Sequence, residues 1–159
     1  MTHKSSDMTR RSALGFFAAT FIVGPGSSFA QTQAILVHKD PNCGCCAGWV
    51  QHLKDAGFTV TVQETAQLQA VRKRLGVPGD LAACHTAEVA GYVIEGHVPA
   101  SAIRQLLEKR PVAVGLAVPG MPAGSPGMEG GTPQKYDVVL FGTSGRQSFM
   151  QFIGTKATS

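Results

Sequence analysis

Four cysteines are the residues of this sequence whose type and spacing could do chemistry. Three fall within four positions, at Cys43, Cys45 and Cys46, and the fourth is Cys84. Cys43 and Cys46 have C-x-x-C spacing, which lets two sulfur atoms meet across one helical turn, where a helix N-terminus stabilises a thiolate. A thiol–disulfide oxidoreductase is the first function that this pair suggests, and it remains an alternative below.

Cys45 and Cys84 do not suit a simple redox pair. Cys45 would compete for any disulfide, and Cys84 is followed directly by His85, a further candidate ligand. Thiolates select Cu(I), zinc or iron–sulfur clusters over hard cations. Tetrahedral zinc sites more often use separated C-x-x-C pairs, so zinc is the runner-up metal. Because the adjacent Cys45 and Cys46 side chains diverge, they suit different ions of a small multinuclear cluster with bridging sulfurs better than one shared ion, an arrangement that Cu(I)–thiolate chemistry allows.

Two structural disulfides are a third possibility, and the default for four cysteines in an oxidising compartment. Among other side chains, Met121 and Met128 lie in two Pro-Gly-Met turns, and their thioethers are weaker candidate ligands, although each can simply cover apolar surface. We expect Trp49 to pack in the core or to cover the cysteines. His38 and His97 are weaker candidate ligands than His85, and each can simply be a solvated or hydrogen-bonded histidine. His52 is expected on an exposed helix face.

The elements that must position the cysteines follow from hydrophobic periodicity. Residues 34–38 are a short apolar run typical of a buried strand, and a turn over 39–42 leads directly to the first cysteine. Apolar residues at helical spacing from Cys46 onward predict a helix that ends near Gly57. The three clustered cysteines are therefore expected on a strand-to-helix loop and on the first helical turn.

The remaining chain predicts a regular alternation of elements. The expected elements are a strand at 58–63, a helix at 68–75, a hairpin of 84–89 with 92–95, a helix at 99–107, an irregular surface stretch at 115–133 and a closing hairpin at 136–152. This is an α/β, thioredoxin-like β-α-β-α-β-β-α core with a Gly/Pro/Met-rich loop and an added β-hairpin. The basic run Arg72, Lys73 and Arg74 is expected on a solvated helix face.

The first thirty residues are typical of an export signal. Arg10 and Arg11 precede an apolar run, and small residues at Ser28 and Ala30 suit signal peptidase. The paired arginines favour the twin-arginine route, with a general secretory signal as the alternative. We therefore predict a signal at residues 1–30 and a metal-binding domain at residues 31–159. The apolar run is too short for a permanent membrane anchor, so the domain is expected in the periplasm.

Composition bounds the function further. Hydrophobic residues make up 43% and charged residues 15% of the chain, which allows a buried core and excludes global disorder. Loss of the signal removes three of 14 basic and one of 10 acidic residues, which leaves a net charge of +2. No basic stripe with interleaved aromatic residues remains, so nucleic-acid binding is not expected.

Several short segments are distinctive when they are taken together: KDPNCGCC at 39–46 with Trp49, CHT at 84–86, EGHVPA at 95–100, GLAVPGMP at 115–122 and SPGME at 125–129. With these segments the chain resembles a known family, the CopG-type periplasmic copper-resistance proteins, long described as a metal-binding domain of unknown function. The resemblance implies a thioredoxin-like fold and a polynuclear copper–thiolate site at the four cysteines. It also implies a role in copper tolerance, with interconversion of Cu(I) and Cu(II) as one form of that role.

Residues and resemblance together predict an exported protein that sequesters copper or changes its oxidation state. The residues alone indicate a soft-metal site, and copper itself comes from the resemblance. The expected partners are copper ions and other periplasmic copper-handling proteins. Enzymatic activity stays open, because a cluster that cycles between oxidation states needs an electron partner that the sequence does not name.

Overall fold

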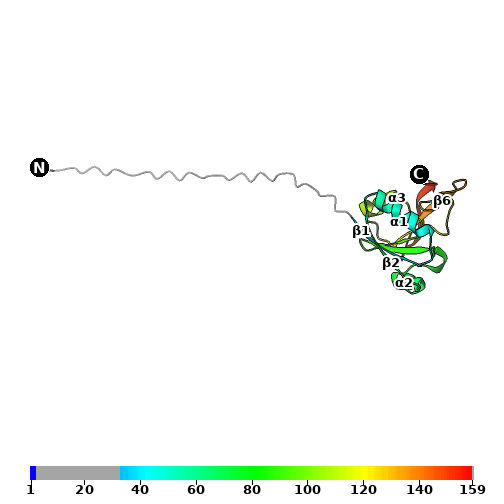
Figure 1. Cartoon of the computed structure of the whole chain (residues 1–159). Helices are drawn as coiled ribbons and strands as arrows, with labels where there is room; N and C mark the ends of the chain where they lie inside the picture. Colours follow the sequence, from blue (N-terminus) through cyan, green and yellow to red (C-terminus); the bar gives the residue numbers. More distant parts are fainter. Residues whose placement is uncertain (3–32, 159) are drawn as a thin grey trace. The chain divides into compact units, whose positions relative to one another are not determined.

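The computed structural model describes residues 1–2 and 33–158 (Figure 1). The predicted export signal lies outside the described residues, apart from its first two. Among the described residues, no helix is both long enough and apolar enough to cross a membrane.

A single mixed sheet of eight strands runs through the domain, in the order β2-β1-β3-β4-β5-β6-β7-β8. Its strands are β1 (Ala34–Lys39), β2 (Thr59–Glu64), β3 (His85–Val89), β4 (Tyr92–Glu95), β5 (Gly115–Ala117), β6 (Lys135–Gly142), β7 (Gly145–Ile153) and β8 (Lys156–Ala157). β1 pairs parallel with β2 and antiparallel with β3, and β4 pairs parallel with β5. The other neighbours are antiparallel.

Three α-helices cover this sheet: α1 (Cys45–Asp55), α2 (Leu68–Leu75) and α3 (Ala100–Lys109). A short 3-10 turn, η1 (Gly79–Leu81), precedes β3. Figure 1 shows α1 and α3 on one face of the sheet and α2 on the other. Alternate strand residues serve the two faces, as the period of a β-strand requires. On β4, for example, Ile94 packs in the larger core with α1 and α3, and Val93 packs in the smaller core on the α2 face.

The predicted mixed α/β class and the order of its elements are confirmed. The first strand, the helix after the cysteines, the hairpin that turns at Ala90–Gly91 and the closing hairpin all occur where the periodicity places them. The closing hairpin extends the same sheet, because β5 bridges it to β4.

The prediction of an irregular surface stretch at 115–133 was wrong at its start. Gly115, Leu116 and Ala117 form the buried strand β5 in the middle of the sheet, and Val118 is buried too. A three-residue strand shows too little alternation to be recognised from sequence. The later part of the stretch is irregular, as predicted, but residues 124–126 are buried against the domain.

Two side chains expected in solvent are partly or wholly buried. Arg72 is 7% exposed and forms an ion pair with Glu95, so only the other two members of the basic run lie on a solvated face. His52 is half-buried, and its Nε2 accepts a hydrogen bond from the backbone N–H of Ala100 at 3.0 Å, at the start of α3. Burial lowers the pKa of His52, which keeps that nitrogen available as an acceptor.

Candidate metal centre

The turn before the cysteines is held by its own polar groups. The Asp40 carboxylate accepts the backbone N–H of Asn42 at 2.8 Å, and the Asp40 carbonyl accepts the N–H of Cys43 at 3.1 Å. The same carbonyl accepts a second bond, at 3.1 Å, from the ammonium of Lys39. Such an Asx turn fixes the chain as it leaves β1, so the sequence Lys-Asp-Pro-Asn sets where α1 begins.

The first turn of α1 presents the clustered sulfurs. Gly44 is the N-cap, and Cys45 and Cys46 are the first two helical residues. No acidic residue lies in this turn, so the positive end of the helix dipole acts on the sulfurs without a competing carboxylate. Cys46 is buried, whereas Cys43 and Cys45 are half-buried and remain reachable from solvent.

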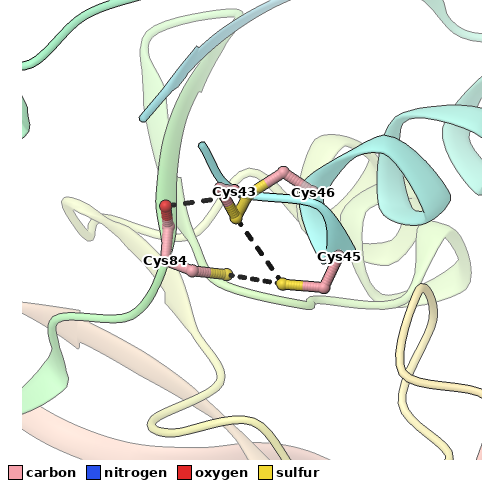
Figure 2. Close-up of side chains that lie close together, drawn as sticks. All are labelled: Cys43, Cys45, Cys46 and Cys84. Atoms are coloured by element: carbon pink, nitrogen blue, oxygen red, sulfur yellow. Dashed lines mark hydrogen bonds between the residues drawn. A yellow bond between two sulfur atoms is a disulfide. The ribbon is translucent and has the colours of Figure 1, made fainter. Parts of the chain in front are cut away.

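The four cysteines meet at one point, as Figure 2 shows. Cys43 and Cys46 form a disulfide, and Cys45 and Cys84 are free thiols. The Cys45 Sγ lies 3.5 Å from the Cys43 Sγ and 3.9 Å from the Cys84 Sγ. All four sulfur atoms lie within 4.8 Å of one another, a spacing that could hold a metal ion.

Cys84 lies in a short segment without strand pairing, between η1 and β3. Its carbonyl lies 3.7 Å from the Cys46 Sγ, and its own Sγ faces the other sulfurs (Figure 2). Burial, reinforced by the neighbouring Cys45, raises the pKa of Cys84 to about 12. The free thiol is therefore protonated at neutral pH, and a soft metal must displace that proton to bind.

His97 faces the same sulfur with a defined nitrogen. Its Nε2 lies 3.0 Å from the Cys84 Sγ, and its Nδ1 lies 2.7 Å from the carbonyl of Pro126. Since a carbonyl only accepts, Nδ1 must carry the hydrogen, and burial lowers the pKa of His97 so that the ring is neutral. Nε2 therefore points its lone pair at Cys84. An Nδ1–H bound to a backbone carbonyl is also the arrangement that commonly orients a metal-binding histidine.

His85 completes a second group of possible ligands. Its Nδ1 lies 3.3 Å from the Cys84 Sγ, and Cys84, His85 and His97 form a set within 4.8 Å. Burial lowers the pKa of His85 to about 3, so this ring is neutral as well. Its buried Nε2 has no hydrogen-bond partner among the described residues. Cys84 is thus the one residue common to the four-sulfur group and the Cys-His-His group.

Trp49 supports both histidines from the core. The indole is fully buried, and its ring centroid lies 4.2 Å from that of His85. Its Nε1 donates to the carbonyl of Val98 at 2.9 Å, directly after His97. The expectation of core packing is therefore confirmed, and the packing surface includes a candidate ligand.

The Gly/Pro/Met-rich loop packs directly on α1. A Cβ added at Gly48 would lie 2.9 Å from the Gly127 Cα, and a Cβ at Gly127 would lie 2.5 Å from the backbone nitrogen of Trp49. Gly127 also has a positive φ of 83°, which disfavours any other residue. This close approach brings the Pro126 carbonyl to His97, so the loop sets the orientation of that ring.

The site opens to solvent on two sides of Cys84. One surface pocket is lined by Cys43, Cys84 and Arg72, together with polar residues of the turn and of α2. The other is lined by Cys84 and by Met121, whose side chain is 54% exposed. Met128 is half-buried in the loop and does not line that second pocket. Either pocket gives a small ion a route to the sulfurs.

The structure thus brings the four predicted cysteines and His85 together and adds His97, a weaker candidate in the sequence, which is hydrogen-bonded and also faces Cys84. His97 lies 13 positions after Cys84, and only the pairing of β3 with β4 shows that the two residues meet. His38, in contrast, is buried elsewhere against Glu88, at 2.9 Å, as a hydrogen-bonded histidine.

Comparisons with known proteins relate the chain to one family model and to two solved structures. Residues 81–128 match a family described as "Protein of unknown function, DUF411". A solved structure described as "Copper resistance protein copG- Form 2" is 48% identical, with a TM-score of 0.73, over 77% of this chain and 99% of that chain. A second, "Copper resistance protein copG- Form 1", is 47% identical, with a TM-score of 0.73, over 78% of this chain and 100% of that chain. No curated protein sequence matches.

Proposed function

The chain belongs to the CopG family of copper resistance proteins, and from this premise we propose that it is an exported protein that binds copper and acts in copper tolerance. The observation that carries the proposal is the convergence of four cysteine sulfurs, two of them free thiols, beside a shared Cys-His-His set. Thiolates favour Cu(I), and imidazole nitrogens accept copper as well. The donor set therefore fits the copper named in the descriptions of the relatives.

The ligands that we propose are Cys43, Cys45, Cys46 and Cys84, with His85 and His97 at the same point. The Cys43–Cys46 disulfide must first be reduced, because a disulfide sulfur is not a thiolate ligand. Reduction consumes two electrons and two protons and gives two thiols, which lose their protons on binding. Sulfurs this close together can bridge several ions, so the proposed cargo is a polynuclear Cu(I)–thiolate cluster, with zinc as the runner-up metal.

A redox form of the same function follows from the disulfide. Oxidation of the Cys43 and Cys46 thiols to the disulfide releases two electrons and two protons, which suffices to convert two Cu(II) ions to Cu(I). An external dithiol, itself oxidised to a disulfide, must then supply two electrons and two protons to restore the thiols. On this proposal Cys43 and Cys46 are ligands in their reduced form and the source of electrons when they are oxidised, and Cys45, Cys84 and the two histidines remain to hold the Cu(I) that is formed.

Copper loading of the wild-type protein tests the function. Full-length protein expressed with copper and purified anaerobically from the periplasm is expected to carry more than one copper per chain, with its thiols protected from alkylation. A chain mass that lacks residues 1–30 would support the proposed signal and its cleavage near Ala30. Protein without copper that still cycles a Cys43–Cys46 disulfide would contradict the proposal.

The second candidate function is thiol–disulfide exchange without metal, which the disulfide at the start of α1 favours. It differs from copper binding in what it requires. Exchange needs only Cys43 and Cys46, so it should survive serine at Cys45 and Cys84, whereas copper binding should not. Reduction of a model disulfide by the apo protein, measured beside copper uptake for the same variants, separates the two.

The methionines are proposed as auxiliary copper contacts during loading. Met121 lines a pocket with Cys84, and its thioether can hold Cu(I) before transfer to the sulfurs. Replacing Met121 and Met128 together with leucine is expected to slow copper loading several-fold, by about one order of magnitude at most, without changing the final copper content. Stopped-flow transfer from a Cu(I) chelator measures the rate. The single Met121→Leu and Met128→Leu variants show which thioether carries the effect, and an unchanged rate in the double variant excludes the role.

A further inference from the structure

A buried ion pair lies directly behind Cys84. Arg72 of α2 and Glu95 of β4 are 7% and 0% exposed, and the Arg72 Nε donates to a Glu95 oxygen at 2.9 Å. That oxygen also accepts the backbone N–H of Ala83 at 2.7 Å, and the second carboxylate oxygen accepts the Thr86 hydroxyl at 2.6 Å. The Arg72 guanidinium in turn donates to the Ala83 carbonyl. The pair therefore satisfies both backbone groups of the residue before Cys84.

Among the described residues, no strand pairing or helix includes residues 82–84. Cys84 follows η1 and precedes the first residue of β3, so the strand ladder begins only at His85. A backbone that lacks ladder partners must find them elsewhere when it is buried. Here the two charged side chains supply them, and they act from two elements that are far apart in sequence.

The same network explains why an arginine is buried on α2. The buried residues of this helix are Leu68 and Arg72. The ion pair of Arg72 with Glu95 therefore attaches α2 to the domain at a position where a helix usually buries an apolar side chain. A buried charge is tolerated only when it is paired and hydrogen-bonded, and Glu95 has three donors around its carboxylate. Burial raises the pKa of Glu95, and the bonds from Thr86, Ala83 and Arg72 oppose that rise.

Gly96 fits the segment against the end of β4. Its φ is +73°, and an added Cβ would lie 2.7 Å from both the Ala83 Cβ and the Val118 carbonyl oxygen. The close approach keeps Ala83 beside Glu95 while the chain turns to place His97 on the Cys84 sulfur. Three consecutive residues thus hold the segment around Cys84. The Glu95 carboxylate bonds to the backbone of Ala83, Gly96 lets Ala83 pack closely because it has no side chain, and the His97 imidazole contacts the Cys84 sulfur.

We propose that Arg72 and Glu95 are positioning residues that fix the Cys84 sulfur at the distance from α1 that metal binding requires. They touch no sulfur atom in the contacts described above, and they act through the backbone of Ala83. The effect of these residues on copper affinity rests on the proposed function. Their effect on the position of Cys84 does not, and it can be tested without metal.

The metal-free test uses a chain whose only cysteine is Cys84, made by Cys43→Ser, Cys45→Ser and Cys46→Ser. In this chain the rate of alkylation by iodoacetamide, measured across pH and compared at equal thiolate fraction because Glu95 also raises the pKa of Cys84, reports how tightly the segment is held. Replacing the pair with neutral side chains of similar length, Arg72→Met with Glu95→Gln, is expected to raise the rate at least about tenfold, because local opening then exposes the thiol. Melting curves show whether each variant is folded.

The matched control is the more exposed pair on neighbouring elements, Arg74 of α2 and Glu88 of β3, joined at 3.2 Å. Glu88 is half-buried and also bonds to His38 at 2.9 Å, and glutamine keeps an oxygen for that bond. Arg74→Met with Glu88→Gln removes the same two charges without touching Ala83, and we expect it to leave the alkylation rate within about twofold of the parent. Should the first double variant fail to fold, Thr86→Val removes one donor from Glu95 and is expected to raise the rate by a smaller factor.

The copper test uses the same pairs of substitutions in the chain with all four cysteines. Loss of groups that orient a ligand typically weakens metal binding by about 10- to 100-fold, and we expect this loss of Cu(I) affinity for the Arg72 and Glu95 variant but not for the control. Competition with a chromophoric Cu(I) chelator measures it. If the parent binds no copper, the proposed function fails while the alkylation result still judges the positioning role. Equal alkylation rates in the two double variants would overturn that role.

Discussion

Replacing Cys84 with serine is expected to remove most of the copper from the loaded protein and to weaken Cu(I) binding by more than about 100-fold, because even the loss of an orienting partner costs about 10- to 100-fold. Cys84 belongs both to the four-sulfur group and to the Cys-His-His group, so its loss breaks both. A serine hydroxyl is a hard ligand that Cu(I) does not favour. Copper content after anaerobic loading and a chelator competition give the two numbers.

Cys45→Ser provides the comparison that makes this result specific. Cys45 belongs to the four-sulfur group alone, and its loss leaves the Cys84, His85 and His97 set intact. We therefore expect Cys45→Ser to retain more copper than Cys84→Ser, although less than the wild type. Equal losses in the two variants would mean that the histidines add nothing to the site.

The same two variants decide between the candidate functions. Both keep Cys43 and Cys46, which form the disulfide at the start of α1. A thiol–disulfide oxidoreductase should keep its exchange activity in both, with copper uptake absent from the wild type as well. If copper uptake remains at the wild-type level in Cys84→Ser, the assignment of Cys84 as a shared ligand is wrong.

Local signals in the sequence were sufficient for most elements of the fold. The C-x-C-C run after an apolar strand predicts that the sulfurs lie at a helix N-terminus, and α1 does begin at Cys45. Gly76 ends α2 in the left-handed conformation, as its position after a periodic apolar run predicts. These features depend on neighbours within a few residues, which a sequence displays directly.

The parts of the site that the sequence did not reveal depend on contacts between distant segments. Arg72 lies within a run of three basic residues, a pattern typical of a solvated face, and only the docking of α2 on the sheet shows that it meets Glu95, 23 positions away. The His97 ring is oriented toward the site by its hydrogen bond to the backbone carbonyl of Pro126, 29 positions away. A carbonyl carries no side-chain signal, so no pattern of residue types could have identified this contact.

Trp49→Ala is expected to cause a large loss of stability, about 3–5 kcal/mol of the free energy of unfolding, as is typical when a buried tryptophan is truncated. Small domains have only about 5–15 kcal/mol in total, so the variant should be partly unfolded at moderate denaturant concentrations. The indole is 0% exposed, packs in the larger core and bonds to the Val98 carbonyl. Urea unfolding followed by far-UV circular dichroism measures the loss.

Trp49→Phe separates packing from the hydrogen bond and extends the prediction to the metal centre. Phenylalanine keeps an aromatic ring in the core but cannot donate to Val98, so a smaller loss of about 1–3 kcal/mol is expected from the carbonyl left without its partner. Because that bond adjoins His97, the phenylalanine variant should also bind copper more weakly than its stability alone predicts. Wild-type copper affinity in a folded Trp49→Phe protein would show that Trp49 supports the core without orienting His97.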